Sequence, residues 1–320
     1  GSAPDLVWVK NRDKSDRFHL LTDTVRGATK SLSSNLTSNE ASTTYSNGLT
    51  SFNSDGFSVG NLIDFNGTND AMVAWNWKAG GTASSNTDGS ITSQVSANTD
   101  AGFSVGTYTH NGSGGQTIGH GLSSAPEMVI IKQRSGGNDW VVFENSRPDT
   151  EKYLRLNTTG GYYDYGATLC ATPGATTFEL TYAPSGYTSD NGADYVFYCF
   201  HSVDGYSKVG SYTGNGSADG TFVYTGFRPA FVIIKRTDSA NWWNMFDSAR
   251  ELTNDGVNFN YLQAESTNSE NNNGAALYPA LDFLSNGFKL RYNGATQNAS
   301  GGTYIYLAFA ENPFKYANAR

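Results

Sequence analysis

Charged residues are scarce in this sequence of 320 residues, since Asp, Glu, Lys and Arg make up 16% of it, against about 25% in ordinary globular domains. The 21 basic residues are outnumbered by 29 acidic ones, and the formal net charge is −8. Binding to nucleic-acid phosphates needs clustered Lys and Arg, so we expect no nucleic-acid partner. No apolar run approaches the roughly 20 residues of a membrane-spanning helix, so we expect no membrane insertion.

Cysteine and histidine are also rare. Cys170 and Cys199 are too few for a disulfide framework, and the sequence leaves open whether they are bridged, with two buried free thiols as the favoured interpretation. The four histidines lack the spacing of a zinc site. Residues Asp190–Asp194 offer oxygen ligands that suit calcium, but we interpret them as a polar turn. We therefore predict no metal and no cofactor.

Glycine and aromatic residues are abundant instead. The chain has 36 glycines, and Phe, Trp and Tyr make up 13% of it. The aromatic side chains provide apolar area to bury, which argues against disorder. Asn-Gly and Asp-Gly pairs such as Asn47-Gly48 and Asn286-Gly287 are typical of tight turns between strands. Because no 12-residue segment has a helical period, the sequence predicts an all-β protein.

One motif occurs three times, as Pro4–Lys10, Pro126–Lys132 and Pro229–Lys235. Consecutive lysines of the motif are 122 and 103 residues apart, much farther than the ~20–50 residues of solenoid or propeller repeats. An aromatic residue follows each copy at Phe18, Trp140 and Trp243, and then an acid and an arginine at Asp23 and Arg26, Glu144 and Arg147, and Asp247 and Arg250. We interpret the aromatics as core residues, and we favour a structural role for the charged pairs over a ligand clamp.

The repetition predicts three tandem homologous β-sandwich repeats of jelly-roll type. Each Val-(Trp/Ile)-(Val/Ile) run is apolar on both faces, as a strand buried between two layers requires. We place the first repeat at 1–79, a Gly/Ser/Thr/Asn-rich linker or long loop at 80–101, the second repeat at 102–203 and the third at 204–320. The first copy lacks the Tyr-Thr-x-Asn-Gly segment that precedes the other two, so we expect the sequence to begin inside a longer protein.

These motifs carry a resemblance to a known family. The segments Pro4–Arg12, Gly210–Gly220, Gly226–Arg236 and Tyr304–Phe314 resemble a repeat family common in marine bacteriophages, which consists of tail-fibre or virion structural proteins without an assigned activity. The resemblance implies a jelly-roll-like, virion-associated module that faces the medium and has no established catalytic residues. It also leaves a homotrimer open, because phage fibres are commonly threefold, although three repeats in one chain would imitate a trimer.

Two segments match the Gly-x-Ser-x-Gly pattern of a hydrolase nucleophile elbow. They contain Ser58 and Ser104. That pattern has catalytic meaning at a sharp turn from a strand into a helix, and neither segment is followed by a helical pattern. We therefore predict that both serines lie on strands and that the protein is not an enzyme.

The repeats differ in aromatic residues that the shared pattern does not require. Residues Tyr162, Tyr163, Asp164 and Tyr165 form a Tyr-rich segment in the second repeat, and Trp242 is an additional tryptophan in the third. Rigid amphipathic rings suit sugars and protein partners, so these five residues are our candidate ligand-binding set, with local packing as the alternative. We predict a non-enzymatic tail-fibre or decoration module that binds host-surface polysaccharide or other virion proteins. The alternative is a carbohydrate-active protein, either a glycan-binding module or a depolymerase.

Overall fold

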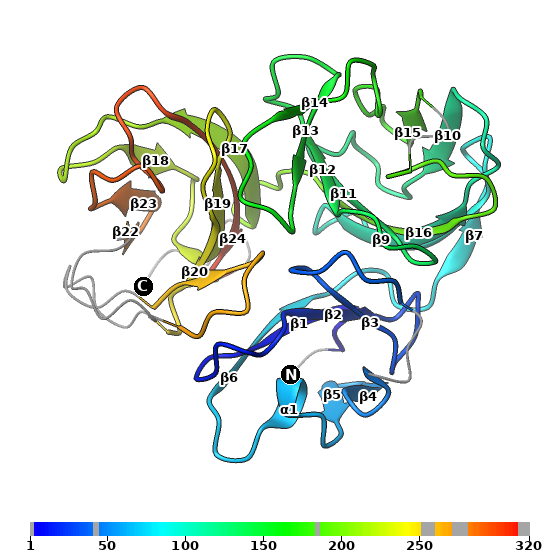
Figure 1. Ribbon diagram of the computed structural model, residues 1–320, viewed down its shortest axis with the longest axis horizontal. Coiled ribbons are helices and arrows are strands. Elements are labelled where there is room, and N and C mark those ends of the chain that lie inside the picture. The colour runs from blue at the N-terminus through cyan, green and yellow to red at the C-terminus, as the bar shows by residue number, and fades with distance from the viewer. Residues whose placement is uncertain (1–2, 41–44, 183–185, 251–259, 271–280, 313–320) are drawn as a thin grey trace.

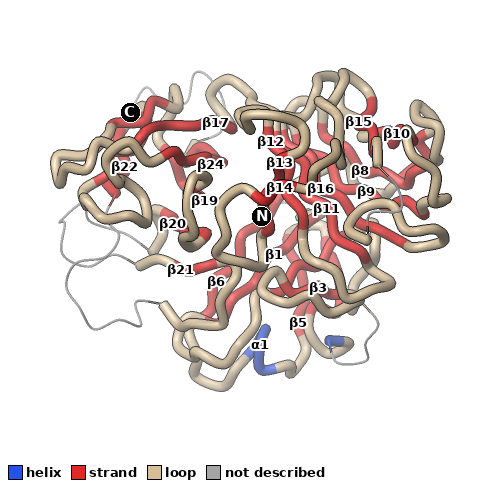
Figure 2. The backbone as a smooth tube through the Cα atoms, turned by 45° about the horizontal axis from the view of Figure 1, so that its top comes forward, coloured by secondary structure: helices blue, strands red, loops and turns tan. Residues whose placement is uncertain are grey.

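Strands dominate the chain. The computed structural model describes residues 3–40, 45–182, 186–250, 260–270 and 281–312 and contains, within those ranges, 24 strands and one α-helix of four residues (Figure 2). All strand pairs between these elements are antiparallel. The all-β prediction is therefore confirmed. No helix in the described part of the chain has the length and hydrophobicity of a membrane span.

The first part of the chain forms a four-stranded sheet of order β3-β2-β1-β6 and a hairpin of β4 and β5 that packs on it. Its elements are β1 (Leu6–Asn11), β2 (Leu20–Asp23), β3 (Ser31–Ser33), β4 (Leu49–Asn53), β5 (Gly56–Val59), α1 (Ile63–Asn66) and β6 (Met72–Trp77).

The middle part forms an eight-stranded sheet of order β14-β13-β12-β11-β16-β9-β8-β7, with the pair β10-β15 across its core. Its strands are β7 (Ser84–Asn86), β8 (Ser93–Asn98), β9 (Phe103–Thr109), β10 (Gln116–Gly119), β11 (Met128–Gln133), β12 (Val141–Glu144), β13 (Lys152–Arg155), β14 (Tyr163–Asp164), β15 (Thr177–Leu180) and β16 (Asp194–Phe200). Residues 80–101, expected to be a linker or long loop, instead contain β7 and β8. Their Ser- and Asn-rich sequences pair with each other and, through β8, with β9.

The last part repeats this plan with a five-stranded sheet of order β17-β24-β19-β20-β21 and a three-stranded sheet of order β18-β23-β22. Its strands are β17 (Ser207–Thr213), β18 (Phe222–Tyr224), β19 (Pro229–Arg236), β20 (Trp243–Asp247), β21 (Leu262–Gln263), β22 (Leu281–Leu284), β23 (Gly287–Leu290) and β24 (Thr303–Ala310). A large and a small sheet enclosing apolar side chains make each part a sandwich.

The three copies of the motif occupy the same position in their sheets. Strands β1, β11 and β19 each lie between a hairpin partner (β2, β12 or β20) and the last strand of their part (β6, β16 or β24). Val7, Val129 and Val232 are all fully buried. The three copies of the motif therefore take matching positions in their sheets.

The large sheets also pack against one another. In Figure 1 they surround a common centre, with β1 below and β11 and β19 above it. One continuous core joins them, because each sheet turns the side chains of its second face inward. Its members include Trp8, Leu21, Trp75 and Trp77 from the first sheet, Val105, Met128, Trp140 and Tyr198 from the second, and Phe231, Trp243, Met245 and Leu307 from the third.

The strand register corrects one predicted equivalence. Lys235 pairs with Trp243, and Ile131 with Val141, so Trp140 and Trp243 lie opposite the motif lysines. In the first part Val9 pairs with Leu20, which places His19 at that position and not Phe18. Sequence spacing missed this because the turn between β1 and β2 has one residue more, and a shift of one residue moves a side chain to the other face.

Candidate functional site

The first acid–arginine pair is buried where two of the sheets meet. Arg26 Nε lies 2.6 Å from Asp23 Oδ2, and neither side chain is exposed. Arg26 also contacts Glu40 at 3.0 Å, and the other oxygen of Glu40 lies 2.6 Å from Arg134 Nη2 in the second part of the chain. The Tyr198 hydroxyl, also from the second part, donates to Asp23 at 2.8 Å. The pair therefore joins the first sheet to the second.

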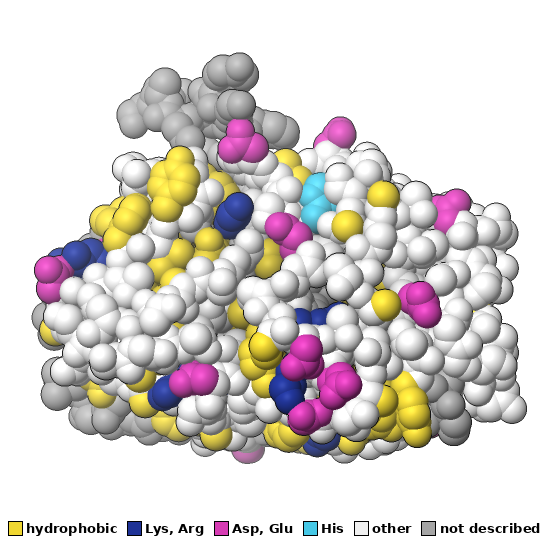
Figure 3. All heavy atoms as spheres, turned by 90° about the horizontal axis from the view of Figure 1, so that it is seen from above, with side chains coloured by type: hydrophobic (Ala, Val, Ile, Leu, Met, Phe, Trp, Pro, Cys, Tyr) yellow, Lys and Arg dark blue, Asp and Glu magenta, His cyan; other side chains and the backbone are white. Residues whose placement is uncertain are grey.

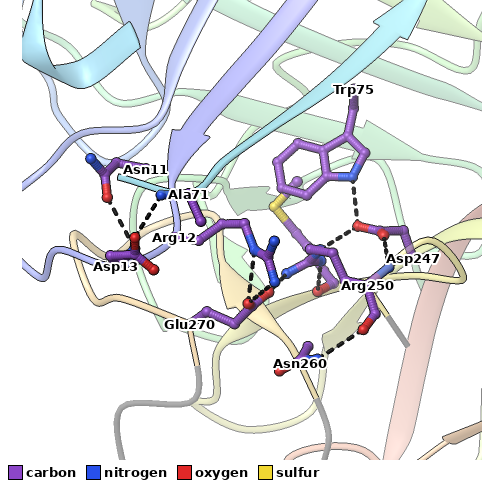
Figure 4. Close-up of polar contacts among 10 residues, drawn as sticks. Asn11, Arg12, Asp13, Ala71, Trp75, Asp247, Arg250, Asn260 and Glu270 are labelled. Carbon is purple, nitrogen blue, oxygen red and sulfur yellow. Dashed lines mark hydrogen bonds and ion pairs between the residues drawn. The ribbon is translucent and has the colours of Figure 1, made fainter. Parts of the chain in front are cut away.

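The third pair repeats this arrangement between the last sheet and the first (Figure 4). Arg250 bridges Asp247 and Glu270, each at 2.5 Å, and Glu270 also binds Arg12 of the first sheet at 2.5 Å. The indole of Trp75 donates to Asp247 at 3.0 Å. Both networks lie between sheets and hold them together, in agreement with the structural interpretation of the charged pairs.

The second pair departs from this pattern. Glu144 accepts hydrogen bonds from the backbone N–H of Ser146 at 2.6 Å and from the Tyr162 hydroxyl. Arg147 donates instead to the carbonyl of Cys170 at 2.7 Å. Tyr162 thus stands where the other two copies have Glu40 and Glu270, and its backbone N–H donates to Thr237 of the third part at 2.8 Å.

The three motif lysines bond to backbone carbonyls inside the fold, and the sequence had not identified them as candidates. Lys10, Lys132 and Lys235 are fully buried, and each donates to the carbonyl of the next residue at 2.6–2.8 Å. Lys132 and Lys235 also reach a carbonyl of the preceding part, Thr37 at 3.0 Å and Thr159 at 3.1 Å. Burial lowers the pKa of all three lysines to about 8. The signal was available in the sequence, since a charged residue ends each apolar motif.

Of the candidate binding residues, Tyr162 is half-buried and packs against the central core. Burial raises the pKa of its hydroxyl, and the carboxylate of Glu144 raises it further. Tyr163 lies beneath the Arg155 guanidinium, whose carbon is 4.0 Å from the ring centroid, and Tyr165 makes an edge contact with Tyr182. Tyr163 and Tyr165 therefore belong to one ring cluster around Arg155 and do not project singly into solvent.

The remaining two candidates are exposed. Asp164 forms an ion pair with Lys152, whose hydrogen bond lowers the pKa of the Asp164 carboxyl. Trp242 is 37% exposed and immediately precedes β20. Its backbone N–H is bonded to Asn241. Trp242 is not among the described residues that line the cleft beside Tyr162, so this cleft does not bring the five predicted residues together.

Tyr162 does line a cleft between the second and third parts of the chain, with a volume of about 510 Å³. Hydroxyl side chains supply most of its polar lining. One carboxylate, Asp238, is among the described residues of the lining, and Arg236 holds it with hydrogen bonds of 2.9 and 3.0 Å. The other polar and aromatic lining residues are Ser146, Ser211, Tyr212, Thr213, Thr237, Thr303 and Tyr304. The sequence signal for Ser211 and Thr213 was their alternation within Gly210–Gly216.

The residues considered for catalysis lie apart from this cleft. Ser58 lies on β5 and Ser104 on β9, so the prediction that both are strand residues is confirmed. Asn53 donates to the Ser58 hydroxyl at 2.9 Å, and Ser104 is fully buried. Neither hydroxyl has a hydrogen bond to a histidine or carboxylate among the bonds of the described residues.

The two cysteines are buried, and the carboxylates considered as calcium ligands form hydrogen bonds within the fold. Cys170 and Cys199 are buried free thiols, as favoured from the sequence, and burial raises the pKa of Cys170 to about 12. Asp190 accepts from the backbone of Gly186 at 2.9 Å, and Asp194 from the hydroxyl of Thr109 at 2.6 Å. No group of three or more metal-ligating side chains occurs among the described residues.

Comparison with known proteins identifies a family and no activity. A family model described as a domain of unknown function (DUF7483) matches residues 1–313, so the chain belongs to that family. No curated protein and no solved structure matches the chain.

Proposed function

We propose that this member of the DUF7483 family is a non-enzymatic adhesion module that binds a neutral glycan in the cleft between its second and third parts. The observation that carries the proposal is the lining of that cleft, in which several hydroxyl side chains occur together with Tyr162, and the one carboxylate among the described lining residues is paired with Arg236. Hydroxyls and an aromatic face recognise sugars, while a paired carboxylate adds little net charge.

One face of the molecule is compatible with this role. Figure 3 shows that most of its atoms belong to uncharged polar side chains or backbone, with few charged side chains, several of which gather near the lower centre of the view. The glycan of a host surface, or another virion protein, is the proposed partner. The resemblance of the repeat motifs to marine phage proteins supports a place in a tail fibre or decoration protein that faces the medium.

The alternative is a depolymerase, which would need two carboxyl groups about 5–10 Å apart across the scissile bond. The cleft offers Asp238 and no second carboxylate among its described lining residues. Incubating the protein with a retained polysaccharide distinguishes the two functions. Retention without new reducing ends supports adhesion, and release of reducing ends supports the depolymerase.

The cleft itself is tested by Ser211→Trp, which fills it from an exposed position on β17. We expect binding to a polysaccharide panel to weaken at least tenfold with an unchanged melting temperature. The matched control is Ser113→Trp, at an exposed loop position between β9 and β10. Unchanged binding by Ser211→Trp would remove the cleft from the proposal. Tyr162→Ala is a poorer probe, because it also breaks the bond to Glu144.

A further inference from the structure

Strand β6 is an edge strand of its sheet, whereas the equivalent strands β16 and β24 lie inside theirs. Strand β16 lies between β11 and β9, and β24 lies between β19 and β17. Strand β6 pairs with β1 on one side, and among the described residues no strand pairs with its other side. The β9 and β17 strands contain the Gly-x-Tyr-Thr sequences of the second and third repeats. The first sheet thus has an open edge that its two counterparts cover.

A groove of about 350 Å³ follows this open edge. All five residues from Val73 to Trp77 line it, and the opposite wall includes Phe231, Asp247 and Phe309 of the third part. Met72, Val73 and Ala74 are partly exposed, whereas the residues at the same register on β16 and β24 are all buried. The lack of a covering strand therefore leaves apolar side chains accessible along β6.

The backbone of β6 also has polar groups directed toward the groove. The Arg12 N–H donates to the Ala71 carbonyl at 2.8 Å, so alternate residues from Ala71 onward face β1. Met72, Ala74 and Asn76 consequently direct their N–H and C=O groups away from β1. The Asn76 side chain donates to the Ala74 carbonyl at 3.2 Å, so one of these groups is bonded to a side chain and not to a strand.

The two covering strands show what chemistry fits such an edge. Val105 lies opposite Tyr198 and Val209 opposite Leu307, and both valines enter the central core. The residue equivalent to Tyr198 and Leu307 on β6 is Trp75, which pairs with Trp8 as Tyr198 does with Ile130. A third strand on β6 would therefore place an apolar side chain opposite Trp75.

Aromatic residues at the start of β9 and just before β17 indicate a second apolar contact for a strand that pairs with β6. Phe103 stacks on Phe200 at a centroid distance of 5.0 Å, and Tyr206, which precedes β17, makes an edge contact with Phe309 at 5.9 Å. Trp77 holds the register position on β6 that Phe200 holds on β16 and Phe309 on β24. It packs against Phe231 and Phe309 and lines the groove. The groove thus lies where a third such ring would stand.

We propose that the open edge of β6 binds an extended polypeptide segment of the β9 and β17 type, which adds to the sheet as an antiparallel strand. The segment carries an aromatic residue near its start and a valine two or three positions later, which occupy the groove beside Trp77 and Trp75. Main-chain hydrogen bonds to Met72, Ala74 and Asn76 supply the affinity, and the apolar side chains fix the register.

The test uses the full chain and a synthetic peptide with the sequence of residues 205–213. In the proposed register the peptide residue equivalent to Lys208 lies opposite Asn76, as Lys208 itself lies opposite Ala308. Directly paired residues of antiparallel strands have Cα atoms 4.5–5.5 Å apart, which a disulfide can span. The Asn76→Cys chain is therefore mixed with peptides that carry cysteine in place of Ser207, Lys208 or Val209, in a buffer of reduced and oxidised glutathione, whose disulfide is reduced as the new disulfide forms. The native cysteines are buried.

We expect the peptide with cysteine at the Lys208 position to form the disulfide at least tenfold faster than the other two. We also expect the unlabelled parent peptide to slow that reaction. Equal rates for the three peptides, or no inhibition by the parent peptide, would overturn the proposal. Disulfide-linked dimers of the Asn76→Cys chain formed without peptide would show that a second copy occupies the edge, and would overturn it as well. Glycan binding in the other cleft plays no part in these readouts.

Discussion

Replacing Glu40 with alanine should loosen the contact between the first and second sheets. The Glu40 carboxylate accepts hydrogen bonds from Arg26 Nη1 at 3.0 Å and from Arg134 Nε and Nη2 at 3.0 and 2.6 Å. Arg26 is fully buried and keeps Asp23 as a partner, whereas the Arg134 side chain is 20% exposed and can be hydrated. One buried N–H of Arg26 therefore loses its partner without access to water.

The magnitude follows from these differences. A hydrogen bond to a charged group contributes about 1.5–3 kcal/mol, and breaking a buried ion pair costs about 3–5 kcal/mol. Because Asp23 still pairs with Arg26 and water reaches Arg134, we expect Glu40→Ala to lower the free energy of unfolding by about 2–4 kcal/mol. Urea unfolding followed by tryptophan fluorescence measures this change.

The matched control is Asp16→Ala, since Asp16 forms an ion pair with Arg17 but its side chain is 71% exposed. Exposed pairs contribute about 0–1 kcal/mol, so this variant should unfold almost like the wild type. A Glu40→Ala variant within about 0.5 kcal/mol of the wild type would refute the role of the network, because that is the spread of neutral surface substitutions.

The Glu40 contribution should also depend on pH. Burial acts to raise the pKa of Glu40, but the hydrogen bonds and charges of Arg134 and Arg26 outweigh it and hold the pKa below its usual value. The folded state therefore binds the proton less readily than the unfolded state, whose Glu pKa is about 4.3. The stability difference between wild type and Glu40→Gln should be constant above that pH and shrink as the pH falls below it. A difference that grew on acidification would contradict this sign.

Three further predictions address catalysis, packing and the buried lysines. Ser58→Ala and Ser104→Ala should leave any hydrolytic activity unchanged, and loss of a measured esterase or glycosidase activity in either variant would overturn the non-enzymatic proposal. Gly106→Ala should destabilise the protein by about 1–3 kcal/mol in thermal or urea unfolding, because the added Cβ would lie 2.2 Å from Cζ of Phe197. Burial lowers the pKa of Lys132 to about 8, below the unfolded value of about 10.4, so the unfolded state binds more protons between those values and Lys132 favours folding increasingly as the pH rises. The stability of the wild type relative to Lys132→Met should therefore increase by about 2–3 kcal/mol between pH 7.5 and 10, and a flat difference would refute the lowered pKa.

The sequence alone determined the strands and their repetition. The runs at Val7, Val129 and Val232 are apolar on both faces, and a segment of that kind is stable only when it is covered from both sides. Asn-Gly and Asp-Gly turns between short β-branched segments likewise excluded a helical fold. Such features are local, so they could be recognised without knowing which strands pair.

Only the tertiary structure decided what covers each face. The second face of every large sheet is buried by the other two sheets, an arrangement that depends on the sheets converging and leaves no mark in any one repeat. Pairing within single parts also escaped the sequence: Tyr162 has a partner in Glu144, and the longer turn between β1 and β2 makes His19, not Phe18, the counterpart of Trp140. Pairing and register depend on contacts between distant residues, and composition and spacing do not record those contacts. The open edge of β6 is evident for the same reason only when its neighbours are compared in space.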